Sequence, residues 1–178
     1  MPTVATESVL LTCIIEEQEE RDTELVDIPN AFMQTKVESV NNMAIIRVRG
    51  ELVDAILEIA PEIYGPYVTE DKKGNKVIIL LCKNTIYGMM VASLLYYMKF
   101  FETLFRCVFE LNPYNACVAK RKVDGKQQTV CWHVDDCKIS HVDSKFNDEL
   151  IEILRQEYES IFEDGTGKMT VHRGKLHK

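Results

Sequence analysis

The chain has 178 residues, of which 46% are hydrophobic and 28% are charged, so it is long enough for one domain with a real core. Its formal net charge of −7 argues against a protein that binds polyanions without discrimination. Because no apolar run is long enough for a transmembrane helix and the amino-terminal residues lack a basic signal region, we expect a soluble, intracellular protein, cytoplasmic or nuclear, with no membrane partner.

The first predicted element is an amphipathic helix over residues 6–20, with Thr6 as its N-cap. Its apolar face consists of Val9, Leu10, Cys13 and Ile14. Strands are predicted over residues 23–28, which end at Pro29, and over residues 43–48. A helix over residues 50–60 and a hairpin over residues 65–82, with its turn at residues 73–75, complete the first half of the chain.

The longest helical segment, residues 88–106, is apolar on nearly all sides and is expected to be buried. Strands over residues 115–121 and 128–134 flank the sequence KVDGKQ, which is a strong hairpin signal. A helix over residues 142–162 is expected to be capped by Asp143 or Ser144, and a final strand covers residues 168–174. This order predicts an α+β domain with helices on one face of an antiparallel sheet.

The segment TVCWHVDDCKISHV, residues 129–142, carries two adjacent aspartates between apolar runs. If Asp135 and Asp136 form a two-residue turn, residues 130, 132, 134, 137 and 139 share an apolar face that packs on the helices. The other face, with Cys131, His133, Lys138 and Ser140, is then polar and open. Since Cys131 and Cys137 fall on opposite faces and none of the six cysteines has metal-site spacing, we expect free thiols.

The two aspartates have two interpretations. Aspartate is common in turns for conformational reasons alone, so the pair could be a plain turn. Asp27 offers the alternative, because it ends an apolar strand and could join the pair to bind two divalent cations through hard oxygen ligands. Asp27 also fits a helix N-cap ahead of Pro29, and the residues alone leave these alternatives open.

Four motifs occur in a characteristic order, namely VDIPNAFMQ, TIYGMMVASLLYY, NPYNACVAKR and WHVDDCKIS. They resemble the reverse transcriptase domain of copia-type retrotransposon polyproteins, in which the first motif reads roughly D-V-x-N-A-F and the last Y-V-D-D. The resemblance covers nearly the whole chain. It implies a single palm-like domain over residues 1–178, an antiparallel palm-like sheet backed by helices, and an incomplete reverse transcriptase fold from which fingers, thumb and ribonuclease H are absent.

The resemblance also implies the roles of individual residues. Asp27, Asp135 and Asp136 match the catalytic carboxylates, and together with the Ile28 carbonyl they would bind two ions of Mg²⁺ or Mn²⁺. The residues implied in nucleotide binding are Phe32, Tyr87, Gly88 and Val134, and the one implied in contact with the primer end is His133. The implied partners are an RNA or DNA template-primer, a dNTP and other parts of the retroelement polyprotein.

The sequence departs from the family pattern at three places. Met89 and Met90 replace a polar pair, His133 replaces the usual tyrosine, and the stretch between Asp27 and Tyr87 is longer than in the family. Because phosphate-binding segments are missing, we expect the isolated chain to polymerise weakly or not at all. One alternative is a non-catalytic remnant or interaction protein that keeps the palm fold. A nucleotide cyclase is less favoured, because the sequence lacks the Gly-Gly turn that such enzymes use.

Overall fold

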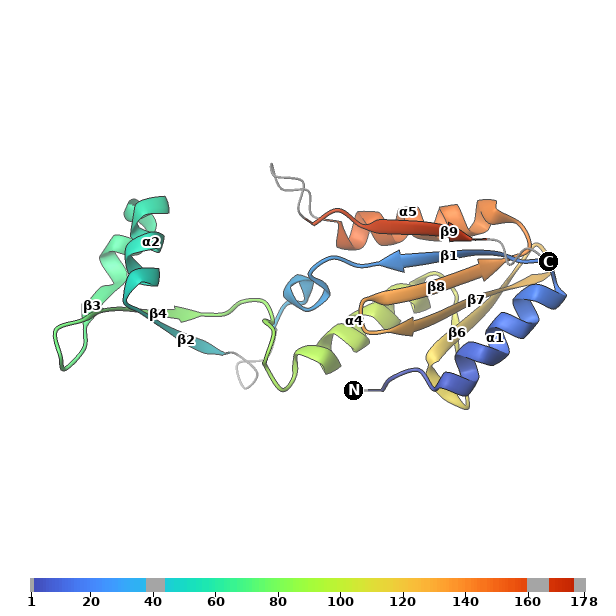
Figure 1. Ribbon diagram of the computed structural model, residues 1–178, viewed down its shortest axis with the longest axis horizontal. Helices are drawn as coiled ribbons and strands as arrows, with labels where there is room; N and C mark the ends of the chain where they lie inside the picture. The colour runs from blue at the N-terminus through green and yellow to red at the C-terminus, as the bar shows by residue number, and fades with distance from the viewer. Residues whose placement is uncertain (1, 38–43, 160–166, 175–178) are drawn as a thin grey trace.

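The computed structural model describes residues 2–37, 44–159 and 167–174. Its largest unit is a six-stranded antiparallel sheet with the strand order β5-β6-β7-β8-β1-β9. The strands are β1 (Asp22–Asp27), β5 (Glu110–Asn112), β6 (Asn115–Val123), β7 (Lys126–His133), β8 (Asp136–His141) and β9 (Thr170–Gly174). The helices next to this sheet are α1 (Thr6–Gln18), the 3₁₀ helix η1 (Ala31–Gln34), α4 (Ala92–Arg106) and α5 (Ser144–Tyr158). Figure 1 shows α4, α5 and α1 arranged around the sheet.

A second, smaller sheet is inserted in the chain between η1 and α4, and Figure 1 shows it set apart from the main sheet. Its strand order is β2-β4-β3, with β2 (Ile45–Arg49), β3 (Val68–Glu70) and β4 (Lys76–Leu81). Its helices are α2 (Glu51–Ile59), α3 (Pro61–Tyr64) and the 3₁₀ helix η3 (Gly65–Tyr67). The expected strand over 43–48, helix over 50–60 and hairpin over 65–82 all fall in this unit, although residue 43 lies outside the described residues. The single domain over residues 1–178 stays a prediction.

The core of the main unit lies between one face of the sheet and the helices α4 and α5. Trp132 of β7 is 1% exposed, and its ring centroid lies 5.3 Å from that of Phe100 on α4. From α5, Leu150, Leu154 and Tyr158 complete the same cluster. At the start of α5, the Asp143 carboxylate accepts a hydrogen bond from the Lys145 backbone N–H, which confirms one of the two expected caps. The predicted α+β class, with an antiparallel sheet backed by helices, is confirmed.

Two predicted hairpins differ in how well their turns were placed. Between β6 and β7, Asp124 and Gly125 both have positive φ angles, 49° and 75°, as the Asp-Gly signal predicts. Between β7 and β8 the prediction was wrong by one residue, because His133 pairs with Asp136 and the turn consists of Val134 and Asp135. The faces of the paired residues were predicted correctly all the same, with residues 130, 132, 137 and 139 buried on one face, because shifting the turn by one residue keeps the alternation of side chains. Val134 was placed wrongly on that face, since it lies in the turn.

The helix α1 lies on the face of the sheet that was expected to be open. Its buried side chains are Thr12 and Glu16, and the Lys138 ammonium of β8 lies 2.9 Å from Glu16 Oε2 and donates to Thr12 Oγ1 at 2.7 Å. The expected apolar face was therefore wrong, because Leu10 and Ile14 are 59% and 55% exposed. The predicted cap was wrong as well, since Ala5 occupies the N-cap position and Thr6 is the first helical residue.

Five further differences concern the remaining elements and the covered face of the sheet. The helix α4 begins at Ala92 instead of residue 88, and it is not buried all round, because Met98 and Phe105 are 56% and 66% exposed. The strand β5 was not predicted, and the predicted helix over residues 142–162 ends at Tyr158 in the part of the chain that the structure describes. The covered face also buries Cys131 and Ser140, which were expected to be open.

The expected free thiols are confirmed, since all six cysteines are free. Among the described helices, none is long and apolar enough to cross a membrane.

Candidate functional site

Two of the predicted carboxylates lie on neighbouring strands at one end of the main sheet. Asp27, the last residue of β1, pairs directly with Asp136, the first residue of β8. Asp136 pairs in turn with His133 of β7, and Asp27 pairs with Thr170 of β9. Because directly paired residues of adjacent strands point to the same face, these four side chains form one row across four strands.

The third carboxylate, Asp135, belongs to the turn beside this row. The Ile28 backbone N–H donates a hydrogen bond of 3.0 Å to the Asp135 carbonyl, so the chain leaving β1 is tied to the β7–β8 turn. The same turn contains Val134 with a φ angle of 57°, a conformation that a β-branched residue rarely adopts. Local strand pairing and this one hydrogen bond therefore bring Asp27, Asp135 and Asp136 to the same end of the sheet.

The electrostatics of this end are unfavourable for three ionised carboxylates. The pKa of the Asp27 carboxyl is raised, first by partial desolvation and then by the charges of Asp135 and Asp136, while His172 of β9 acts in the opposite direction. Repelling carboxylate oxygens are hard ligands that suit Mg²⁺ or Mn²⁺, so the chemistry of the donors fits the predicted ions. Within the described ranges, however, no three His, Cys, Asp or Glu side chains converge into a preformed metal centre.

A group of aromatic residues lies next along the chain, around η1. Phe32 of η1 packs edge-on against Tyr87, with ring centroids 5.1 Å apart. The Thr85 hydroxyl donates to the Phe32 carbonyl and the Asn84 amide donates to the Met33 carbonyl at 2.8 Å, which joins η1 to the segment before α4. Gly88 follows Tyr87 with a φ angle of 92°, which is easily accessible to glycine. Phe32, Tyr87 and Gly88 therefore come together, as their predicted common role requires.

Tyr96 of α4 connects the aromatic group to the carboxylates. Its ring centroid lies 5.9 Å from that of Phe32, and the residue is 1% exposed. Burial raises the pKa of the Tyr96 phenol strongly, and the charges of Asp135 and Asp27 add to this effect, so the three residues are electrostatic neighbours. The Tyr96 hydroxyl has no hydrogen-bond partner among the described residues. It is therefore a buried polar group close to the site.

Sequence reasoning missed the contribution of β9. Thr170 and His172 lie beside Asp27 because β9 pairs with β1, whereas the sequence predicted only that residues 168–174 form a strand. No local pattern gives the position of a strand in a sheet, so nothing in the sequence could have placed these residues next to Asp27. The roles of the predicted site residues stay predictions, although their positions form two adjoining groups.

Comparison with known proteins gives little further information. No family model and no curated protein matches the chain. A telomerase structure from Candida albicans, in complex with a TWJ fragment of telomeric RNA, is weakly similar, with a TM-score of 0.49 and 13% sequence identity. The match covers 99% of this chain and 32% of that protein, so this chain spans about a third of its length. A likeness of this size carries no argument about what the chain does.

Proposed function

We propose that the chain is the palm part of an RNA-directed DNA polymerase of the kind found in copia-type retrotransposons. The observation that carries the proposal is the direct pairing of Asp27 with Asp136, with Asp135 held beside them by the Ile28 hydrogen bond. The ordered motifs in the sequence single out these same three carboxylates. In this proposal the six-stranded sheet with α4 and α5 is the palm of a reverse transcriptase fold.

The carboxylates would hold the metal ions of the reaction. Asp27, Asp135 and Asp136, with the Ile28 carbonyl, would bind two ions of Mg²⁺ or Mn²⁺, which stabilise the attacking and leaving oxygens of an in-line displacement. The pKa of Asp27 is raised by partial desolvation and then by repulsion from Asp135 and Asp136. Bound cations would relieve that repulsion, which supports this assignment.

The aromatic group and the β7–β8 turn would orient the substrates. Phe32, supported by Tyr87 and Gly88, would lie beneath the sugar of the incoming dNTP, where a 2′-hydroxyl would collide with the ring. His133 and Val134 would contact the primer end and the nucleotide, because both lie beside the paired carboxylates. The primer 3′-hydroxyl would lose its proton to solvent, and its oxygen would bond to the α-phosphorus of the dNTP. The bond between the α-phosphorus and the oxygen that bridges to the β-phosphate would break, and pyrophosphate would leave with that electron pair.

The partners of this activity would be an RNA or DNA template-primer, dNTPs and the other segments of a retroelement polyprotein. With a net charge of −7 this chain offers few phosphate contacts of its own, so its template affinity should be low and sensitive to salt. Met90, which stands where the family has a polar residue, is 97% exposed and would meet the nucleic acid through an apolar side chain.

Primer extension tests the proposal. The full chain is incubated with poly-rA/oligo-dT, dTTP and Mg²⁺ or Mn²⁺ at low salt, alone and fused to the fingers and thumb of a copia-type reverse transcriptase. Extension should be weak or absent for the chain alone and present for the fusion protein, and Asp27→Asn or Asp135→Asn should reduce the extension by the fusion protein by at least about 100-fold. The matched control is Asp124→Asn, which changes an aspartate in the other hairpin turn and should leave extension unchanged. Lack of extension in both proteins would refute the catalytic proposal.

The second candidate is a non-catalytic retroelement remnant or an interaction protein. The observation that favours it is that the described carboxylates do not converge into a preformed metal centre. Mn²⁺ binding, measured by electron paramagnetic resonance on the full chain, separates the two candidates. If Asp27→Asn and Asp135→Asn leave the Mn²⁺ affinity unchanged, the site does not bind metal and the second candidate is correct.

A further inference from the structure

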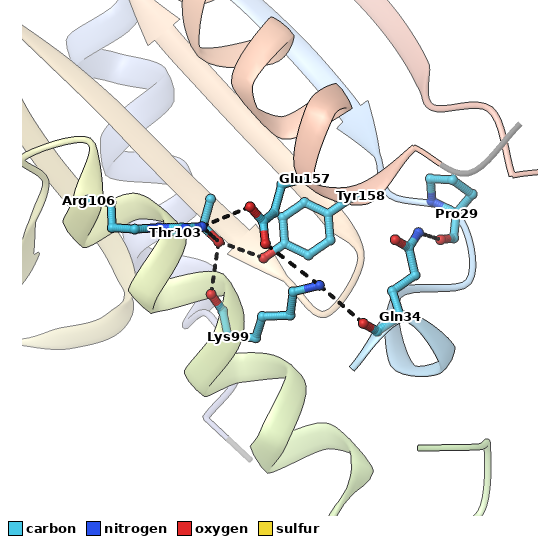
Figure 2. A network of polar contacts seen from close by, with 7 residues as sticks. All are labelled: Pro29, Gln34, Lys99, Thr103, Arg106, Glu157 and Tyr158. Atoms are coloured by element: carbon cyan, nitrogen blue, oxygen red, sulfur yellow. Dashed lines mark hydrogen bonds and ion pairs between the residues drawn. The ribbon is translucent and has the colours of Figure 1, made fainter. Parts of the chain in front are cut away.

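We infer that Lys99 of α4 is a positioning residue, which fixes η1 and so holds Phe32 beside the carboxylate end of β1. The consequence for nucleotide binding rests on the proposed function, because only there does Phe32 contact the incoming sugar. No motif in the sequence singles out Lys99. The inference follows from a chain of polar contacts that joins α5, α4 and η1 (Figure 2).

Lys99 holds the end of η1 directly. Its ammonium donates a hydrogen bond of 3.1 Å to the carbonyl of Gln34, the last residue of η1. The Gln34 side-chain amide donates in turn to the Pro29 carbonyl at 2.7 Å, and Pro29 comes two residues after Asp27. Gln34 thus joins the two ends of the segment that carries Phe32, and Lys99 anchors Gln34 to α4.

Lys99 is itself fixed from the side of α5. Its Nζ atom lies 4.7 Å from the ring centroid of Tyr158 and 3.9 Å from Glu157 Oε1. Thr103, one turn further along α4, donates to the Lys99 carbonyl at 3.0 Å and lies 3.0 Å from the Tyr158 hydroxyl. Arg106 pairs with the same Glu157 carboxylate at 2.9 Å, so the ion pair of Lys99 with Glu157 is the longer of the two. The ammonium therefore has a fixed place between α5 and η1.

The surroundings of Lys99 make its contact with Gln34 important. An open pocket of about 650 Å³, lined by Lys36, Leu95, Met98 and Lys99 among others, lies beside the contact of Phe32 with Tyr96, so the Gln34 end of η1 is less closely packed on α4 than the Phe32 end. Partial burial lowers the pKa of Lys99, and the nearby Arg106 and Lys36 lower it further, while Glu157 acts in the opposite direction. A carbonyl acceptor offsets part of this desolvation cost, so the ammonium favours the geometry that holds η1 in place.

Hydrogen exchange on the full chain tests the positioning without requiring activity. The reporter is the Thr35 amide, which donates to the Phe32 carbonyl at 3.0 Å. In Lys99→Met the Thr35 amide should exchange about tenfold faster, because η1 loses a partly screened hydrogen bond from a charged donor. The exchange rates of the amides in α4 and α5 should change by less than about twofold. Lys99→Arg should restore protection. Lys145→Met, which removes a lysine at the start of α5 that pairs with Glu149 and is outside this network, should leave the Thr35 amide unchanged.

Binding of dTTP, measured by equilibrium dialysis with Mn²⁺, tests the consequence for the nucleotide. The Kd of Lys99→Met should rise about tenfold, and the Kd of Lys99→Arg and Lys145→Met should stay within about twofold of the parent chain. Equal Thr35 exchange in Lys99→Met and the parent would overturn the positioning role, whatever the polymerase assay gives. Faster exchange with unchanged dTTP affinity would overturn the link to the nucleotide. If the parent chain binds no dTTP, the proposed function fails instead, and the exchange data alone decide whether Lys99 fixes η1.

Discussion

Replacing Asp27 by asparagine should stabilise the folded protein at neutral pH. Asp27 lies directly opposite Asp136 and near Asp135, and these charges raise the pKa of its carboxyl after the effect of desolvation. Like charges directly opposite each other on neighbouring strands cost roughly 0.2–1 kcal/mol. Because Asp27 is exposed, salt screens part of this repulsion and the upper end of that range is the most to expect. For a chain of this size, the gain corresponds to roughly 0.5–4 °C in Tm.

The pH dependence of this effect has a defined sign. The folded-state pKa of Asp27 lies above its ordinary value of 3.8, so its favourable contribution to stability is fully present below about pH 3.8. That contribution is lost as the pH rises through the folded-state pKa. The asparagine side chain of the variant does not titrate, so the stability difference between Asp27→Asn and the parent chain should grow from acidic to neutral pH and then level off.

Urea unfolding at a series of pH values and low salt measures this difference. The control is Asp124→Asn, which changes an aspartate in the β6–β7 turn, far along the sheet from the carboxylate pair. Added Mn²⁺ should reverse the order if the carboxylates bind it, because a ligand of the native state stabilises only the chain that binds it. A variant that is less stable than the parent at pH 7 without metal, or a difference independent of pH, would refute the repulsion argument.

Three further predictions concern the parts of the fold that support the site. Trp132→Ala should lower the free energy of unfolding, measured by urea titration, by about 3–5 kcal/mol, because Trp132 is 1% exposed. The control Phe105→Ala, at a position that is 66% exposed, should change this free energy by less than about 0.5 kcal/mol. Lys138→Met should cost about 3–5 kcal/mol because it leaves Glu16 buried and unpaired, and adding Glu16→Gln should recover much of that loss in a double-mutant cycle. Burial raises the pKa of Glu24 above 4.5, so stability should fall as the pH rises through that folded-state value, and Glu24→Gln should flatten this part of the urea-unfolding pH profile.

Features decided by neighbouring residues could be predicted from the sequence, and the β6–β7 hairpin is the clearest example. Asp124 and Gly125 favour positive φ angles by themselves, and the turn forms where they occur. At the β7–β8 turn the same preference for aspartate pointed to Asp135 and Asp136, yet the turn takes Val134 and Asp135. Asp136 belongs to β8 because it pairs with Asp27 of β1. Turn preferences cannot predict this pairing, since it joins residues far apart in the sequence.

Features decided by distant partners could not be predicted. The apolar residues of α1 have helical spacing, but the helix buries Thr12 and Glu16 because the Lys138 ammonium, far away in the sequence, lies beneath them. The position of β9 beside β1 is also decided by a distant partner. A strand pattern predicts the length of a strand and its buried face, but it does not predict which strand will pair with it. In the candidate site, the motifs identified the carboxylates, whereas the row across the sheet and the contacts of Lys99 required the fold.

Two local costs coincide at the carboxylate end of the sheet, and this coincidence is the strongest physical argument for a site there. Elsewhere the buried carboxylates Glu16 and Glu24 each have a polar partner, the Lys138 ammonium and the Asn147 amide. At Asp27, His172 is the one described charge that offsets the repulsion of the neighbouring aspartates. Val134, in the adjoining turn, holds a φ angle of 57° that costs on the order of 1 kcal/mol for a β-branched residue. Charge repulsion and backbone strain at the same place do not stabilise the fold, and a cation bound there, as the proposed function requires, would relieve the repulsion.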